Sequence, residues 1–176
     1  AETGTWLSHQ PRSNMNNAVG VAQVEGLMRA GINVCLGNDG FTQDMWSEWK
    51  TAYLLHKVWH LDPRRMNGID IVQMGIYNNA ALANVFFPGK RVGQLVHGAA
   101  ADLIFVDYHP FTPVSAGNLP WHILFGFNES MVTSTMVAGQ FLMRDGELLT
   151  LDEAEIAAQA LELAPEVWAR YLEFAQ

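Results

Sequence analysis

Cysteine, basic side chains and long apolar runs are scarce in this sequence, and each shortage excludes a class of protein. Cys35 is the one cysteine, so no intrachain disulfide can form and a reducing compartment is expected, namely the cytoplasm. Ten Lys and Arg stand against 18 Asp and Glu, without a basic cluster, and the net charge of −8 argues against nucleic acid and anionic membranes as partners. No apolar run approaches the ~20 residues that cross a bilayer.

What is present is enough apolar material for a buried core. Hydrophobic residues make up 49% of 176 residues, which suits one or two domains. The N-terminus shows neither a basic start nor an apolar signal core. The chain begins with Ala1 instead of Met, and a strand-like run starts within five residues, so we expect it to be part of a longer protein.

The first half of the sequence alternates between strand and helix patterns. Strands are predicted at Thr5–His9 and Ile32–Leu36, with a helix over residues 17–30 between them. The polar stretch Gln10–Asn14 is predicted as a turn in which Pro11 ends the strand pairing. A near-continuous apolar strand such as Ile32–Leu36 is typical of a parallel sheet covered on both faces, so we expect a βαβ crossover.

Two longer helices and a region of short strands are predicted next. The helices cover Met45–Trp59 and Ile69–Ala83. The short strands are separated by Gly, Pro and Asn, and this spacing predicts a small β-rich module. They lie at Val92–Leu95, Leu103–Asp107, Val132–Ala138 and Phe141–Met143.

The final segment is predicted to be helical. Thr150-Leu-Asp-Glu153 matches a capping box, with a hydroxyl at the N-cap and Glu at N3. The helix runs toward Ala164, and Pro165 breaks or restarts it before Phe174. The sequence therefore divides into three expected parts, residues 1–83, 84–149 and 150–176.

The sequence G-N-D-G, residues 37–40, places the carboxylate of Asp39 directly behind the second predicted strand. Functional groups of parallel α/β proteins gather at the carboxyl ends of strands. An aspartate there can bind a divalent metal and accept a proton from the water that the metal activates. Asp and Gly also favour tight turns, so a purely turn-forming role is the alternative.

Polar side chains also follow the first predicted strand. His9 ends the strand, and Ser13 and Asn14 come shortly after it. They can brace a neighbouring carboxylate or line a substrate site; the alternatives are a hydrogen-bonded structural histidine and helix-capping Ser and Asn. Trp46, close to the second strand end, can line a pocket wall or pack in the core.

Two further features are candidates for binding: Arg12, and the pair His56 and His60. Arg12, in a predicted loop, can contact an anionic substrate group or solvent alone. His56 and His60 share a helix face at the i, i+4 spacing of zinc proteases. Lys57 stands where the general-base glutamate would have to be, so a solvent-facing or interface role is favoured for this face.

Four motifs occur in order along most of the chain: H-Q-P-R-S-N (His9–Asn14), L-G-N-D-G (Leu36–Gly40), G-Q-L-V-H-G-A-A-A-D-L (Gly93–Leu103) and V-A-G-Q-F-L (Val137–Leu142). Together they resemble the C-terminal part of the amidohydrolase superfamily, in its deaminase and chlorohydrolase branch. The resemblance implies an α/β fold. About two β/α units end a (β/α)8 TIM barrel, and the C-terminal share of a small β-sandwich and a terminal helix follow.

The resemblance also implies roles for the site residues. Asp39 matches the family's strand-eight aspartate, which implies a ligand of the catalytic metal (zinc, or alternatively iron) and a proton acceptor. His9, Ser13 and Asn14 match the strand-seven motif, which implies that they brace or line the site. The family's H-x-H motif and its histidines on strands five and six have no counterpart here.

These features predict the C-terminal portion of a metal-dependent hydrolase. It would cleave a C–N or C–halogen bond of a small, heterocyclic substrate through metal-activated water. We expect the isolated chain to be inactive, because hydrolytic zinc usually has three protein ligands. Open sheet edges call for the missing N-terminal barrel region or for a homo-oligomer. The alternative is a non-catalytic scaffold or association module that keeps the family's packing.

Overall fold

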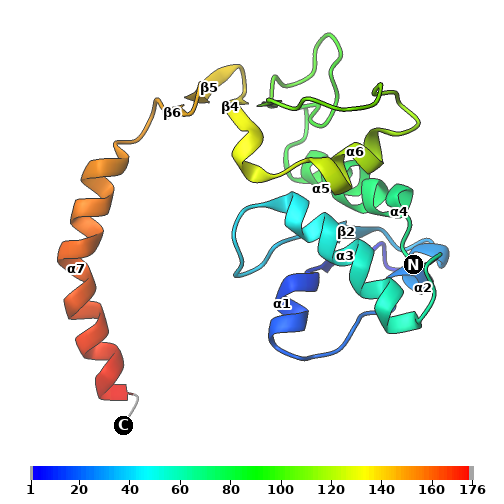
Figure 1. Ribbon diagram of the computed structural model, residues 1–176, viewed down its shortest axis with the longest axis horizontal. Helices are drawn as coiled ribbons and strands as arrows, with labels where there is room; N and C mark the ends of the chain where they lie inside the picture. Colours follow the sequence, from blue (N-terminus) through cyan, green and yellow to red (C-terminus); the bar gives the residue numbers. More distant parts are fainter. Residues whose placement is uncertain (1, 175–176) are drawn as a thin grey trace.

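A computed structural model describes residues 2–174, and its first unit is a short pair of parallel strands (Figure 1). β1 (Leu7–His9) pairs with β2 (Val34–Leu36), and the helices α1 (Pro11–Asn16) and α2 (Val24–Arg29) connect them. All three residues of β2 are buried. The predicted parallel pair with a helical crossover is therefore confirmed.

Helix α1 replaces the turn that was predicted for residues 10–14. Pro11 is the first residue of this helix, a position where its missing N–H is no loss and its fixed φ suits the helix. The prediction that Pro11 lies in a turn was wrong, because the same proline can end a strand and start a helix. The helix predicted over residues 17–30 was placed too early, since α2 begins at Val24.

Two long helical segments follow, as predicted. α3 (Met45–His60) starts at the N-cap residue Asp44, whose carboxylate accepts hydrogen bonds from Trp46 N over 2.9 Å and Ser47 N over 3.2 Å. The second segment is one continuous run of α4 (Gly68–Val72), the π-helical η1 (Gln73–Asn78) and α5 (Asn79–Phe86).

The π-helical turn faces the indole of Trp49 on α3. A Cβ on Gly75 would come within 2.5 Å of Trp49 Nε1, so only glycine lets the two helices approach this closely. The indole of Trp49 and the neighbouring side chains form the core between β2, α3, α4 and a later helix, α6 (Leu119–Gly126). Its buried members are Val24, Val34, Leu36, Trp49, Ala52, Met66, Ile71, Met74, Ile123 and Leu124.

The second half of the chain forms a four-stranded antiparallel sheet. Its strands follow the order of the sequence: β3 (Leu103–Val106), β4 (Val132–Val137), β5 (Gln140–Arg144) and β6 (Glu147–Leu148). Three of the expected strands are confirmed, and β6 was not predicted. The helix α6 (Leu119–Gly126) and the 3-10 turn η2 (Glu129–Met131) between β3 and β4 were also not predicted.

The strand predicted at Val92–Leu95 is not formed in the structure. The backbone N–H and C=O of Val92 form hydrogen bonds with a side chain instead of with a neighbouring strand. Val92 N donates to Asn84 Oδ1 over 3.0 Å, and Val92 O accepts from Asn84 Nδ2 over 3.3 Å. Asn84 of α5 thereby fixes this segment in an irregular conformation.

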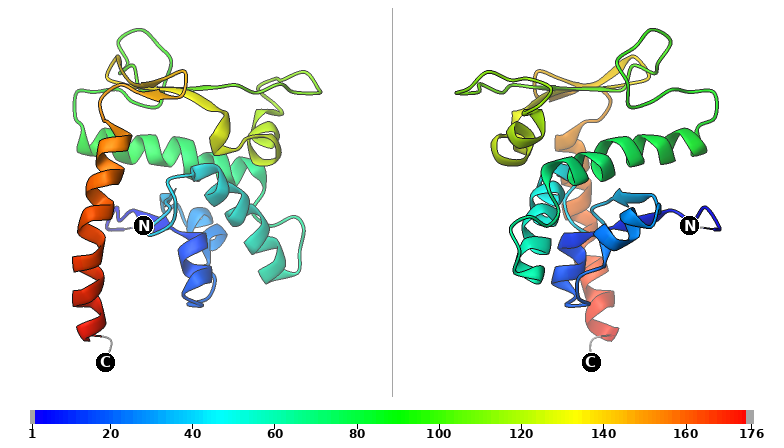
Figure 2. Two further views of the ribbon diagram at one scale, coloured as in Figure 1. Left: turned by 60° about the vertical axis from the view of Figure 1, so that its left-hand side comes forward. Right: turned by 90° about the vertical axis from the view of Figure 1, so that its right-hand side faces the viewer.

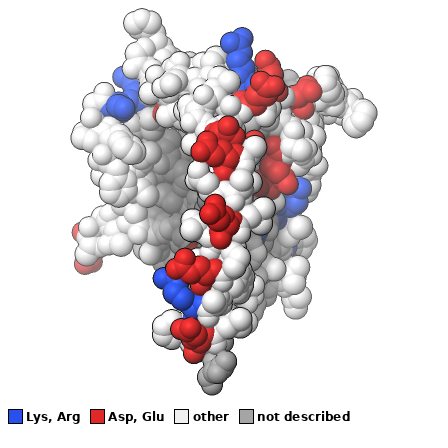
Figure 3. Space-filling view, turned by 90° about the vertical axis from the view of Figure 1, so that its left-hand side faces the viewer, with Lys and Arg blue, Asp and Glu red and all other residues white. Residues whose placement is uncertain are grey.

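Helix α7 (Glu153–Phe174) runs unbroken through Pro165 and carries no buried residue. Figures 1 and 2 show it descending from the end of the sheet, and Figure 3 shows acidic side chains along its surface. Its first turn is capped by Asp152, because Glu155 N donates to Asp152 Oδ1 over 3.0 Å. The predicted capping box at Thr150 was therefore placed too early, and the predicted break at Pro165 was wrong. None of the helices within residues 2–174 is long and apolar enough to cross a bilayer.

Candidate active site at the carboxyl ends of β1 and β2

The carboxyl ends of β1 and β2 lie side by side and lead into two short connections. His9 is opposite Leu36, and Gly37 N donates to His9 O over 3.0 Å. A Cβ on Gly37 would lie 3.1 Å from Ser8 Oγ, so this close approach favours glycine. The beginning of α1 and the loop of residues 37–44, here called the Asp39 loop, therefore meet at one edge of the sheet.

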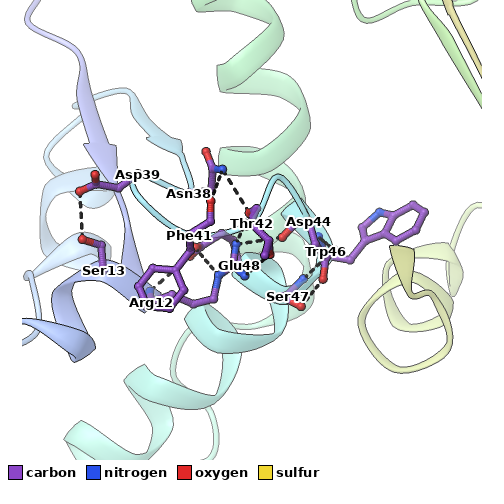
Figure 4. A network of polar contacts seen from close by, with 10 residues as sticks. All are labelled: Arg12, Ser13, Asn38, Asp39, Phe41, Thr42, Asp44, Trp46, Ser47 and Glu48. Atoms are coloured by element: carbon purple, nitrogen blue, oxygen red, sulfur yellow. Dashed lines mark hydrogen bonds and ion pairs between the residues drawn. The ribbon is translucent and has the colours of Figure 1, made fainter. Parts of the chain in front are cut away.

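Asp39 and Ser13 come together across these two connections (Figure 4). The Ser13 hydroxyl donates to Asp39 Oδ2 over 2.9 Å, with Ser13 buried and Asp39 exposed. The backbone of Asp39 has φ of +52°, in the left-handed region that non-glycine residues rarely adopt. Such a conformation costs free energy and persists where surrounding contacts hold it. Two residues singled out from the sequence are thus brought into direct contact.

His9 points into the core and pairs with a histidine of α3. Its Nε2 lies 3.2 Å from His56 Nε2, so one ring donates and the other accepts, and the rings meet edge-on. Burial is the main cause that lowers the pKa of His9 to about 4, and the charge of the neighbouring His56 is the second cause. Burial also lowers the pKa of His56 to about 4. Both rings are therefore neutral at pH 7. The expectation of a solvent-facing or interface role for His56 was wrong, since His56 is fully buried.

Asn14 and Trp46 lie on neighbouring elements without bonding to Asp39. Asn14 is half-buried on α1, and no hydrogen bond joins its side chain to Asp39 within residues 2–174. The indole of Trp46 meets Phe127 edge-on, with ring centroids 5.1 Å apart. Figure 4 shows Trp46 at the opposite end of the polar network from Asp39. Trp46 thus joins α3 to the segment after α6.

Arg12 makes contacts that the sequence did not lead us to expect. Its Nε lies 2.5 Å from Glu48 Oε1, and its terminal nitrogens donate to the Asp39 loop at Thr42. Glu48 is fully buried. The sequence did contain one indication of a buried Glu48. Glu48, Ala52 and His56 are spaced four residues apart and therefore share one face of α3, and this face is buried.

A divalent metal would find one suitable carboxylate at this edge of the sheet. Carboxylate oxygen is an ordinary zinc ligand, and the Ser13 hydrogen bond engages one of the two Asp39 oxygens. Within residues 2–174, no group of three or more His, Cys, Asp or Glu side chains is arranged to hold a metal ion. Asp39 therefore fits as one member of a ligand set, and the described residues do not complete that set.

The sequence matches the model of the Amidohydrolase family over residues 1–142. The chain belongs to the amidohydrolase family. A 5'-deoxyadenosine deaminase of Methanosarcina mazei is 35% identical to it over 173 residues, which cover 96% of this chain and 39% of that protein. A 5-methylthioadenosine/S-adenosylhomocysteine deaminase of Syntrophobacter fumaroxidans is 33% identical, over 93% of this chain and 37% of that protein. This amidohydrolase chain thus spans less than half the length of these curated relatives.

Solved structures support the same assignment. An adenosine deaminase of Xanthomonas campestris with bound zinc superimposes with a TM-score of 0.80 at 25% identity, over 96% of this chain and 38% of that one. An atrazine chlorohydrolase of Arthrobacter aurescens complexed with zinc gives a TM-score of 0.71 at 20% identity, over 92% of this chain and 36% of that one, which is a likeness of fold. The predicted amidohydrolase family and the predicted fold, the C-terminal part of an amidohydrolase barrel, are confirmed. The relatives and structural neighbours named above are deaminases and a chlorohydrolase.

Proposed function

We propose that this amidohydrolase chain is the C-terminal portion of a metal-dependent deaminase that acts on a small, adenosine-like compound. Relatives above 30% identity carry the names of 5'-deoxyadenosine and 5-methylthioadenosine/S-adenosylhomocysteine deaminases. The chlorohydrolase is similar at 20% identity and in fold alone. Cleavage of a C–N bond is therefore favoured over cleavage of a C–halogen bond.

The observation that carries the proposal is the geometry of Asp39. Its carboxylate projects from the loop behind β2 and is oriented by the Ser13 hydroxyl at 2.9 Å. A divalent metal, zinc in the solved neighbours, would polarise water when bound. Asp39 would contribute one oxygen ligand and accept a proton from the attacking water. The His9–His56 pair fixes the end of β1, and Asn14, next to Ser13 on α1, is our candidate for lining the substrate site.

These roles match what deamination requires. The reaction replaces an exocyclic amino group with oxygen from water and releases ammonia. One proton must leave the water, and the departing nitrogen must gain one. A carboxylate held beside the water can take the proton and pass it to the leaving nitrogen, which is ordinary general acid–base catalysis.

The test uses an enzyme in which the remaining barrel strands accompany this chain, called the complete barrel enzyme below. They come from its own reading frame or from the corresponding segment of the Methanosarcina mazei relative. Ammonia release is measured with 5'-deoxyadenosine and 5-methylthioadenosine, and chloride release with a chlorinated triazine. We expect ammonia from at least one nucleoside, and Asp39→Asn to reduce kcat at least ~100-fold. Chloride release alone, or near-normal kcat in Asp39→Asn, would overturn the proposal.

A second candidate is a non-catalytic scaffold, and one observation favours it: the incomplete ligand set within residues 2–174. The two candidates differ in what the complete barrel enzyme does, since a scaffold releases no ammonia from any adenosine-like compound. The metal content of the purified 176-residue chain adds a second comparison. Stoichiometric zinc or iron in that chain would argue against a scaffold and would require ligands beyond Asp39.

A further inference from the structure

We propose that Arg12 and Glu48 are positioning residues that hold the Asp39 loop against Ser13. The proposal rests on the proposed function and concerns how the site of that function is kept in place. Neither residue touches Asp39. Arg12 binds the loop that carries Asp39, and Glu48 acts on that loop through Arg12 (Figure 4).

The Arg12 guanidinium fastens the second half of the Asp39 loop at several points. Nη1 donates to Thr42 Oγ1 over 3.0 Å, and Nη2 donates to Thr42 O over 2.8 Å and to Asp44 O over 3.1 Å. The carbon at the centre of the guanidinium lies 5.3 Å from the ring centroid of Phe41. Arg12 therefore contacts three residues that follow Asp39 closely in the sequence.

Glu48 fixes the guanidinium from the other side. Its Oε1 accepts from Arg12 Nε at 2.5 Å, and its Oε2 accepts from the Arg12 backbone N at 3.4 Å. The side chain of Glu48 is 0% exposed and that of Arg12 14% exposed. Removing one partner of a buried ion pair leaves the other charge uncompensated, so Arg12 and Glu48 depend on each other. Because Glu48 accepts from both the side chain and the backbone N of Arg12, it restrains the direction of the guanidinium. The orientation of Arg12 is thus set from within α3.

These contacts leave the Asp39 loop held at both ends. At its start, Gly37 N is bonded to His9 O of β1, and at its end Thr42 and Asp44 are bonded to Arg12. Asp39 lies between these two attachments with its left-handed backbone. Ser13 follows Arg12 directly on α1. The same turn of the helix therefore positions both the guanidinium that binds the loop and the hydroxyl that donates to Asp39. A planar guanidinium can make these bonds at once, and a lysine ammonium cannot.

The test compares variants of the complete barrel enzyme. In Arg12→Lys the charge opposite Glu48 remains while the fork of donors is lost, and Thr42→Val removes one acceptor on the exposed loop. The matched controls are Arg64→Lys, at a side chain that is 88% exposed, and Thr150→Val, outside the site. Melting temperature, zinc content, kcat and KM are measured for each. Arg12→Ala is also assayed with millimolar guanidinium added.

If Arg12 positions the Asp39 loop, substitutions that break its contacts should lower kcat and change KM little. We expect Arg12→Lys to lower kcat by ~10- to 100-fold with KM within about threefold, as a misplaced group of this kind does. Thr42→Val should lower kcat about threefold, and guanidinium should restore part of the activity of Arg12→Ala. Unchanged kcat in Thr42→Val and in a folded Arg12→Lys would overturn the proposal. If Arg12→Lys does not fold, Thr42→Val decides alone. Failure of the proposed function would show itself differently, as full activity in Asp39→Asn.

Discussion

At the scale of single residues, the buried histidines His9 and His56 should make the folded protein sensitive to acid. Each ring uses Nε2 in their mutual hydrogen bond, and neither Nδ1 has a hydrogen-bond partner within residues 2–174. Burial is the main cause that lowers both pKa values. At His56, the charge of Glu25 opposes this effect, and His60 and Lys57 add to it. The pair therefore favours the neutral form of both rings.

The folded protein should lose stability as the pH drops from the ordinary histidine pKa of 6.5 to the folded pKa of about 4. The folded pKa of about 4 lies below the ordinary 6.5, so between pH 6.5 and 4 the unfolded chain binds more protons than the folded chain. At about 1.4 kcal/mol per pKa unit, we expect each of the two rings to lower the free energy of unfolding by about 3 kcal/mol from pH 7 to pH 4.

Urea unfolding of the 176-residue chain at pH 7, 6, 5 and 4 measures this loss. The variant His56→Gln should show a shallower decline, because one titrating ring is removed from the core. His97→Gln, at an exposed histidine, is the control and should follow the unmodified chain. Parallel pH curves for His56→Gln and the unmodified chain would contradict the account.

Some residues of the candidate site could be predicted from the sequence and others could not. Asp39 and Ser13 belong to short motifs that follow strands, and neighbouring parallel strands bring such motifs together. The pairing of Arg12 with Glu48 joins a predicted turn to a helix far along the chain. It depends on the packing of α1 against α3, which no local pattern specifies.

At the scale of elements, α3 depends on the cap that Asp44 provides. The Asp44 carboxylate accepts hydrogen bonds from Trp46 N and Ser47 N and from the hydroxyl of Ser47. We expect Asp44→Ala to lower the free energy of unfolding by about 1–2 kcal/mol, because these helix N–H groups lose their acceptor. Urea unfolding at pH 7 measures the change. Glu162→Ala on the exposed α7 is the control, and an equally small effect of both substitutions would refute the capping role.

Periodic helices were predictable and aperiodic elements were not. The apolar residues of α3 and of the run from α4 to α5 recur at helical spacing, so both segments were found. α6, with the sequence L-P-W-H-I-L-F-G, is apolar around most of its circumference and gives no period. The strand pattern at Val92–Leu95 was misleading, because Asn84 takes the hydrogen bonds that a neighbouring strand would have supplied.

At the scale of the whole molecule, this chain holds two strands of a barrel that closes with eight. Within residues 2–174, β1 and β2 each pair only with the other, so one edge of each strand is open. The exposure of Asp39 agrees with an open edge of this kind. The division at residues 83 and 149, and a homo-oligomer as one way to cover the open edges, stay predictions.

Asp39 is proposed to be a metal ligand, and this role can be measured as the zinc content of the complete barrel enzyme. Asp145→Asn is the matched control, since Asp145 is an exposed aspartate with φ of +50° in the turn between β5 and β6. After equilibration with zinc and removal of the excess, we predict one zinc per chain in Asp145→Asn and a clear deficit in Asp39→Asn, with both proteins folded. Equal zinc in the two variants would contradict the account.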